Sequence, residues 1–204
     1  MNDRPGSARN APALAVVLLA AGPSSRLGQS KQLVRKDGES LVRRSVRVLS
    51  ALQPAQLLVV TGCEAERVQA EIGDLPLRVV FNPDWALGMG ASINRGARSL
   101  APGAGGVLIA VCDQWRLSEA DLLRLLETWQ ADPTRICVAS WKEGEAFVSG
   151  PPVIFPRTLI PELKSMQFGR GARQLIDRYM DLVEFVELPN AAFDLDRPED
   201  LQRL

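Results

Sequence analysis

LLAAGPSSRLGQSK, residues Leu18 to Lys31, is the stretch around which the rest of the chain is expected to fold. It continues an apolar run from residue 13, and a short β-branched run bounded by turn residues is typical of a strand buried on both faces. The strand then enters a loop with two glycines and two cations, Arg26 and Lys31. Glycines let backbone N–H groups approach phosphate oxygens, and cations balance phosphate charge. The loop alone leaves an ordinary strand-to-helix turn open as an alternative.

The composition limits the classes of function. The 204 residues are 46% apolar, which is enough for one domain with a real core. Lys plus Arg and Asp plus Glu both number 24, so no surface for nucleic acid is implied. No apolar run is long enough to span a bilayer. Arg4 and Arg9 before the apolar run loosely imitate a signal peptide, but cleavage there would remove the strand and its loop.

The chain contains no histidine. This excludes Ser-His-Asp and Cys-His nucleophiles, histidine zinc sites and imidazole bases. Chemistry that depends on carboxylates, cations and a hard metal ion remains, and phosphoryl or nucleotidyl transfer is of this kind. Cys63, Cys112 and Cys137 form no CxxC pair, which favours incidental thiols in a reducing cytoplasm.

Strand-like and helix-like segments alternate along the chain. We expect further strands at 56–61, 77–81, 106–111, 135–140 and 182–188, and helices at 40–52, 64–72, 90–100, 118–130 and 158–165, with a terminal helix from Pro198. The β-α-β-α-β order predicts a Rossmann-like, three-layer α/β/α fold with a mostly parallel sheet. A disordered polar tail, residues 1–12, is expected to precede a single domain over residues 13–204.

The loop has the spacing of a known signature. It reads Leu19-Ala20-Ala21-Gly22-x-Ser24-x-Arg26-x-Gly28-x-x-Lys31, which resembles the MobA/MocA-like nucleotidyltransferases, and most of all the molybdenum cofactor cytidylyltransferases. The resemblance implies the nucleotide-diphospho-sugar transferase type of fold and a loop that wraps the nucleotide triphosphate. Guanylyltransferases of the family usually carry glycine at the place of Ala21, so the resemblance favours CTP over GTP. A Walker P-loop and GxGxxG do not fit this spacing.

A second stretch, Asn82 to Gly96, is similar to the family segment that closes over the nucleotide. The resemblance assigns nucleotide contacts to Asn82, Gly90 and Ser92, in addition to the loop residues Leu19, Ala20, Ala21, Gly22, Ser24, Arg26 and Lys31. A glycine-rich helix start with Trp85 as a packing anchor is the alternative.

Two aspartates are the candidate metal ligands. Asp113 follows the strand at 106–111, where open α/β sheets bind ligands, and Mg²⁺ favours one or two carboxylates with phosphate oxygens. The family usually has proline where this chain has Trp115. Phe193 to Asp200 resembles the family's Asp-x-Asp-Thr-Pro-Glu-Asp. Asp194 and Asp196 alternate along an extended segment, so their side chains are expected to point opposite ways. We choose Asp196 as the second ligand of Mg²⁺, or of Mn²⁺ in its place, with Asp194 as its substitute.

The acceptor side is less well marked. Gly169 to Arg173 matches the Gly-Ala-Arg part of a family motif, but Phe168-Gly169 replaces the usual Gly-Asp. The resemblance offers Arg170 and Arg173 to the acceptor phosphate, and a solvated charge at a helix start is the alternative for each.

The resemblance implies transfer of CMP from CTP to molybdopterin with release of pyrophosphate, with Arg26, Lys31 and Asp113 as catalytic residues. The setting would be cytoplasmic, and a molybdoenzyme is a compatible partner. GTP as donor, or another phosphorylated acceptor such as a sugar phosphate, is the first alternative. A non-catalytic nucleotide- or cofactor-binding protein, or a molybdoenzyme chaperone, is the alternative of another class.

Overall fold

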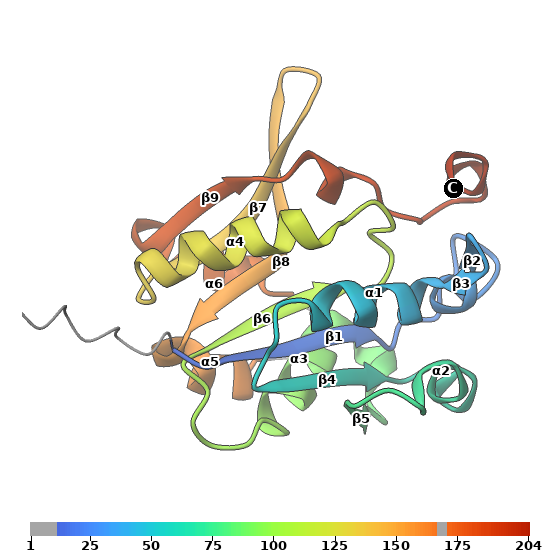
Figure 1. The fold of residues 1–204 in the computed structure, drawn as a ribbon, viewed down its shortest axis with the longest axis horizontal. Helices are drawn as coiled ribbons and strands as arrows, with labels where there is room; N and C mark the ends of the chain where they lie inside the picture. The colour runs from blue at the N-terminus through green and yellow to red at the C-terminus, as the bar shows by residue number, and fades with distance from the viewer. Residues whose placement is uncertain (1–11, 167–170) are drawn as a thin grey trace, which may run out of the picture.

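A seven-stranded, mostly parallel sheet forms the centre of the computed structural model, which describes residues 12–166 and 171–204 (Figure 1). The strand order is β5-β4-β1-β6-β8-β7-β9. These strands are β1 (Leu14–Ala20), β4 (Gln56–Thr61), β5 (Arg78–Phe81), β6 (Gly106–Val111), β7 (Ile136–Glu143), β8 (Ala146–Pro156) and β9 (Val183–Glu187). Within this sheet, β8 runs antiparallel to its neighbours β6 and β7, and the other strand pairs are parallel. The short strands β2 (Arg35–Lys36) and β3 (Glu39–Ser40) pair separately.

Helices cover both faces of the sheet, so the fold has three layers. One face carries α1 (Leu41–Ser50), α2 (Ala65–Ile72) and α4 (Glu119–Ala131), and the other carries α3 (Met89–Arg98), α5 (Ile160–Lys164) and α6 (Arg173–Arg178). Figure 1 shows α1 and α4 in front of the sheet and α3, α5 and α6 behind it. The predicted Rossmann-like α/β fold is confirmed.

Strand β1 divides the core between the two faces. Leu14, Val16 and Leu18 pack toward α1, α2 and α4, and Ala15, Val17 and Leu19 pack toward α3, α5 and α6. All residues of β1 are buried, as its continuous apolar run predicts. Gly96 lets α3 approach closely, because a Cβ at this position would lie 2.5 Å from Val17 Cγ1.

The order in which the chain adds strands to the sheet reverses between β1 and β6, although these two strands are parallel. Helices α1 and α2 connect β1, β4 and β5 on one face, and α3 then returns on the other face to β6. In open α/β sheets, ligands bind at the carboxyl ends of the strands at such a point. Ala20 and Val111 end β1 and β6 at this edge, so the loops that follow them bound the expected site.

The structure differs from the sequence prediction mainly between residues 141 and 156. β8 was not predicted as a strand, and the proline pair in its Gly150-Pro151-Pro152 run is unusual inside a sheet. The pairing of β7 and β8 shifts register between Val138 and Ala139, and this irregularity accommodates the two prolines. The terminal helix is a 3₁₀ helix, Pro198–Arg203. By contrast, the strands Gln56–Thr61 and Gly106–Val111 lie where they were predicted.

Within residues 12–166 and 171–204, no helix has the length and apolar character needed to cross a membrane. The predicted tail, residues 1–12, lies outside the described residues except for Pro12.

Candidate active site

Gln32 organises the loop between β1 and the 3₁₀ turn Lys31–Leu33. Its side chain is buried, and its amide nitrogen donates to the carbonyl oxygens of Ala20 at 3.2 Å and Gly22 at 2.8 Å. Its amide oxygen accepts from the hydroxyls of Ser24 at 3.3 Å and Ser30 at 2.8 Å. One side chain therefore holds both ends of the loop together.

The backbone and hydroxyl of Ser24 fix the conformation of the loop between Ser24 and Lys31. Its backbone has a φ of 54°, in the left-handed region, and its carbonyl accepts from the N–H of Leu27 at 3.0 Å. Its hydroxyl oxygen accepts from the N–H of Lys31 at 3.1 Å. The Lys31 side chain is thereby directed across the edge of the sheet toward β6.

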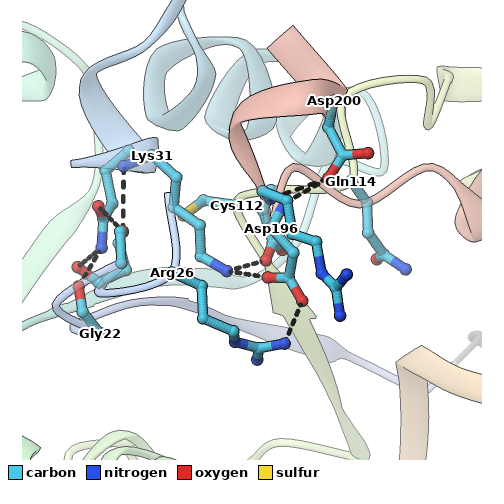
Figure 2. Close-up of polar contacts among 12 residues, drawn as sticks. Gly22, Arg26, Lys31, Cys112, Gln114, Asp196 and Asp200 are labelled. Carbon is cyan, nitrogen blue, oxygen red and sulfur yellow. Dashed lines mark hydrogen bonds and ion pairs between the residues drawn. The ribbon is translucent and has the colours of Figure 1, made fainter. Parts of the chain in front are cut away.

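Two carboxylates surround the Lys31 ammonium. It contacts Asp113, just beyond β6, and lies 3.2 Å from Asp196 Oδ1 in the C-terminal segment (Figure 2). Arg26 Nη1 lies 3.3 Å from the other oxygen of Asp196. The structure thus brings together Arg26, Lys31 and Asp113, the three predicted catalytic residues, and also Asp196, a predicted metal ligand.

The Lys31–Asp113 contact is largely shielded from water. The exposed fractions of the two side chains are 21% and 10%. Burial opposes the charge on Lys31, but the attraction of Asp113 outweighs it and raises the pKa of Lys31 above its ordinary value. Lys31 is therefore a permanent cation at neutral pH, suited to phosphate oxygens and unsuited to act as a base. Burial also raises the pKa of Cys112 to about 12, which keeps its thiol neutral.

Backbone pairing attaches the C-terminal segment to the end of β6. The N–H of Leu195 donates to the carbonyl of Asp113 at 3.1 Å, and Gln114 and Asp194 form an antiparallel bridge. Asp200 then accepts from the N–H of Asp196 at 3.1 Å. These contacts hold Asp196 beside Asp113, although the two residues lie far apart in the sequence.

Asp194 lies near the other two aspartates. Burial, followed by repulsion from Asp113 and Asp196, raises its pKa to about 7. The residue as a whole is nevertheless exposed to solvent. The three carboxylates of Asp113, Asp194 and Asp196 outnumber the two nearby cations, Arg26 and Lys31, and this excess of negative charge favours a bound cation.

The residues present fit a divalent metal ion. Asp113 Oδ1 is buried without a hydrogen-bond partner among the described residues, although its other oxygen contacts Lys31. In residues 12–166 and 171–204, no group of three or more His, Cys, Asp or Glu side chains is arranged to hold a metal ion. Two carboxylates completed by phosphate oxygens are what Mg²⁺ accepts, so this site suits an ion that arrives with a nucleotide.

Three cavities adjoin this charged centre. The outer one, about 190 Å³, lies between the loop and Asp196 and is lined by Pro23, Ser24, Ser25, Arg26, Leu27, Lys31 and Asp196. The inner one, about 110 Å³, is lined by Leu19, Ala21, Gly22, Lys31, Gln32, Met89, Ser92, Val111, Cys112 and Asp113. The third, about 330 Å³, is mainly apolar and lies between α3, β8 and α6. The charged side chains are therefore concentrated around the outer and inner cavities, and the third cavity is mainly apolar.

The three residues predicted from the second stretch, Asn82, Gly90 and Ser92, differ in whether they line the inner cavity. Ser92 lines the inner cavity, and its hydroxyl accepts from Asn82 Nδ2 at 3.1 Å. Asn82 is buried behind Ser92 and also accepts from the N–H of Asp84 at 3.1 Å. Gly90 is buried within α3. Ser92 thus faces the cavity, while Asn82 supports it.

On the acceptor side, Arg173 lines the apolar cavity. Its guanidinium pairs with Asp177 at 2.9 Å and donates to the Ser149 hydroxyl at 3.4 Å. Arg170, with Phe168 and Gly169, lies outside the described residues.

Sequence reasoning missed Gln32 and Met89. A polar residue between Lys31 and the apolar Leu33-Val34 pair was the available signal for Gln32. Met89 gave no signal, because a methionine at a helix start is most simply interpreted as core packing, whereas the structure leaves it half-exposed beside two cavities.

The matches to known proteins extend over most of the chain. Residues 16–183 match the MobA-like NTP transferase domain, a span that includes Lys31 and Asp113 and ends before Asp196. Nicotine blue oxidoreductase of Paenarthrobacter nicotinovorans is 30% identical over 200 residues, which are 95% of this chain and 97% of that protein. A Rhodopirellula baltica protein, named "Probable molybdenum cofactor guanylyltransferase", is 33% identical over 137 residues, 66% of this chain and 64% of that protein.

The solved structures agree with this match. Rv0371c of Mycobacterium tuberculosis has a TM-score of 0.79 at 26% identity, over 95% of this chain and 98% of that chain. A structure of Rv0371c in complex with manganese has a TM-score of 0.76 at 25% identity, over 94% and 97% of the two chains.

Proposed function

This chain belongs to the MobA-like NTP transferase family and is a nucleotidyltransferase, and from that premise we propose that it transfers CMP from CTP to molybdopterin with release of pyrophosphate. One observation carries the proposal. The Lys31 ammonium lies between Asp113 and Asp196, at the carboxyl ends of β1 and β6 and beside a glycine-bearing loop. This arrangement suits a phosphate chain that arrives with its own metal ion.

The loop side would hold the nucleotide. Arg26 and Lys31 face the outer cavity, where the β- and γ-phosphates would lie. The backbone N–H groups of Gly22 and of residues 24–26 would add further donors, whereas Pro23 has none. The base would enter the inner cavity beside Ala21 and Ser92. Binding there would place the α-phosphorus near Lys31.

Asp113 and Asp196 would hold Mg²⁺, with Mn²⁺ as a substitute, and Asp194 is the alternative to Asp196. The ion, when bound, would neutralise phosphate charge and polarise the α-phosphorus. The manganese complex of Rv0371c supports a divalent ion in a similar protein.

The apolar cavity would take the acceptor. Its walls suit a flat heterocycle, and Arg173 at its rim would attract the acceptor phosphate. An oxygen of that phosphate would attack the α-phosphorus, forming a new P–O bond while the bond to pyrophosphate breaks. The attacking oxygen is already anionic, so no general base is needed. Arg26 and Lys31 would stabilise the charge that develops on pyrophosphate.

GTP is the second candidate donor, because a relative is named a molybdenum cofactor guanylyltransferase. Ala21 supports CTP on the family pattern, so the two donors are to be compared directly. We further propose a cytoplasmic setting, supported by three free cysteines, and a molybdoenzyme as recipient of the product.

The test is pyrophosphate release with each of the four nucleoside triphosphates and Mg²⁺, with and without molybdenum cofactor, and with mass spectrometry of the product. Release with CTP that requires the cofactor, together with a cytosine dinucleotide product, is the expected result. A guanine dinucleotide would replace CTP by GTP as donor. CTP binding without release under any condition would overturn the proposed acceptor.

A further inference from the structure

The inner cavity and the apolar cavity share one wall. Three residues, Leu19, Met89 and Val111, line both. Leu19 and Val111 belong to the adjacent central strands β1 and β6, so backbone pairing fixes their positions. Met89 belongs to α3 and is 50% exposed. Of the three, it is therefore the side chain that can be altered without disturbing the sheet.

The backbone places Met89 at the boundary. Gly88, just before α3, has a φ of 99°, a conformation that side chains rarely adopt, and its carbonyl accepts from the N–H of Ala91 at 3.2 Å. Met89 is thus the first residue of the helix, held by a turn that requires glycine. Its sulfur also borders the segment before α6, because a Cβ at Gly171 would lie 3.6 Å from Met89 Sδ. The Met89 side chain therefore reaches from α3 toward the opposite wall.

We propose that Met89 is a specificity-determining partition that limits the size of the nucleobase in the inner cavity. This inference rests on the proposed function, which puts the base in the inner cavity and the acceptor beyond it. The inner cavity holds about 110 Å³ and the apolar one about 330 Å³. With Met89 in place, a larger purine meets the side chain. With a short residue there, the two volumes join and a purine gains room.

The effect should appear in the ratio of dissociation constants for GTP and CTP. Apolar contacts of one methylene group change discrimination by about 10- to 200-fold. We therefore expect Met89→Ala to lower Kd(GTP)/Kd(CTP) about tenfold, at the lower end of that range, because the side chain is half-exposed. Met89→Leu keeps the bulk and should stay within about twofold of wild type. Met89→Phe adds bulk and should raise the ratio.

The experiment is calorimetric titration of CTP and GTP, each with Mg²⁺ and without acceptor, into the full chain and these variants. Met180→Ala is the matched control, because Met180 is 46% exposed and lines none of the three cavities. Its ratio should equal that of wild type.

An unchanged ratio in both Met89→Ala and Met89→Phe would overturn the partition. An equal change in Met180→Ala would do so as well. The proposed donor is tested separately by which nucleotide, CTP or GTP, the wild type binds with the lower Kd. If the wild type prefers GTP, the CTP proposal fails, and Met89→Ala must still lower the ratio for the partition to stand.

Discussion

Two sides of this site differ in what holds their side chains in place. We call the part around Lys31 and Gln32 the loop side, and the part around the apolar cavity and Arg173 the cavity side. On the loop side, Gln32 makes four hydrogen bonds and Lys31 lies between two carboxylates. On the cavity side, the walls are apolar, and Arg173 is held by an exposed partner, Asp177. Polar networks tolerate little change when buried, whereas apolar walls accept related shapes. We therefore propose that the loop side sets the chemistry and that the apolar cavity sets which acceptor is used.

The strongest way to break this comparison is to remove the central charges. Lys31→Met and Asp113→Asn should each lower kcat for pyrophosphate release about 100- to 1,000-fold, because each removes a group from the charged centre around the phosphates. Lys142→Met, an exposed lysine on β7, is the control and should keep full activity. Circular dichroism would check that the variants fold. Full transfer rates in folded Lys31→Met would contradict the role of this centre.

The second change tests whether Gln32 holds the loop. Gln32→Leu leaves the carbonyls of Ala20 and Gly22 without their donor, so the free energy of unfolding should fall by about 1–3 kcal/mol. Kd for CTP should rise about tenfold, which corresponds to about 1.4 kcal/mol of lost binding. Gln32→Glu keeps the shape but loses both donors, so it should resemble Gln32→Leu. Urea unfolding and calorimetry measure the two effects, and Gln69→Leu on the exposed face of α2 is the control.

The third change sharpens the contrast by weakening the cavity side alone. Arg173→Ala should raise KM for the acceptor about fivefold and leave KM for CTP unchanged, because an exposed charge contributes about 1 kcal/mol or less. Arg178→Ala removes a cation from the same helix, one that pairs with Glu162 instead, and should change neither KM. Equal effects of the two variants would mean that Arg173 has no special place at the acceptor.

The smallest effect is expected far from the site, in the Arg43–Asp74 pair. Two bonds from Arg43, each 2.7 Å, hold the pKa of Asp74 at about 2, below its ordinary 3.8. A lowered pKa contributes stability that is fully present above pH 4 and is lost as the pH falls toward 2. Asp74→Asn should therefore lower the urea midpoint slightly at pH 7, and the difference from wild type should shrink by pH 3. A constant difference would exclude this linkage.

Local patterns predicted much of the fold. The apolar runs at Gln56–Thr61 and Gly106–Val111 became strands, and Ser118 with Asp121 formed the predicted helix start, a capping box. These features depend on neighbours in the sequence, so their signals are local. β8 was missed because its prolines are tolerated only where the pairing with β7 shifts register, and one strand's sequence does not reveal its partner's register.

The sequence prediction grouped Asp113 and Asp196 around one metal ion and placed Arg26 and Lys31 at the same phosphates, but it did not give the contacts among these residues. The signature from Leu19 to Lys31 identified the loop, and Asp113 and Asp196 were chosen by position and resemblance. That Lys31 would contact both carboxylates did not follow from the sequence. Gln32 and Met89 were missed because their roles depend on what lies opposite them.

The sequence by itself determined the strand, the glycine loop and its cations, the absence of histidine chemistry and the family. Only the tertiary structure decided that Lys31 meets Asp113, 82 residues away, and Asp196, 165 residues away. The physical reason is that secondary structure follows from backbone and neighbour preferences within a few residues. Contacts across the sheet depend on the order of strands, which α3 sets by returning the chain beside β1.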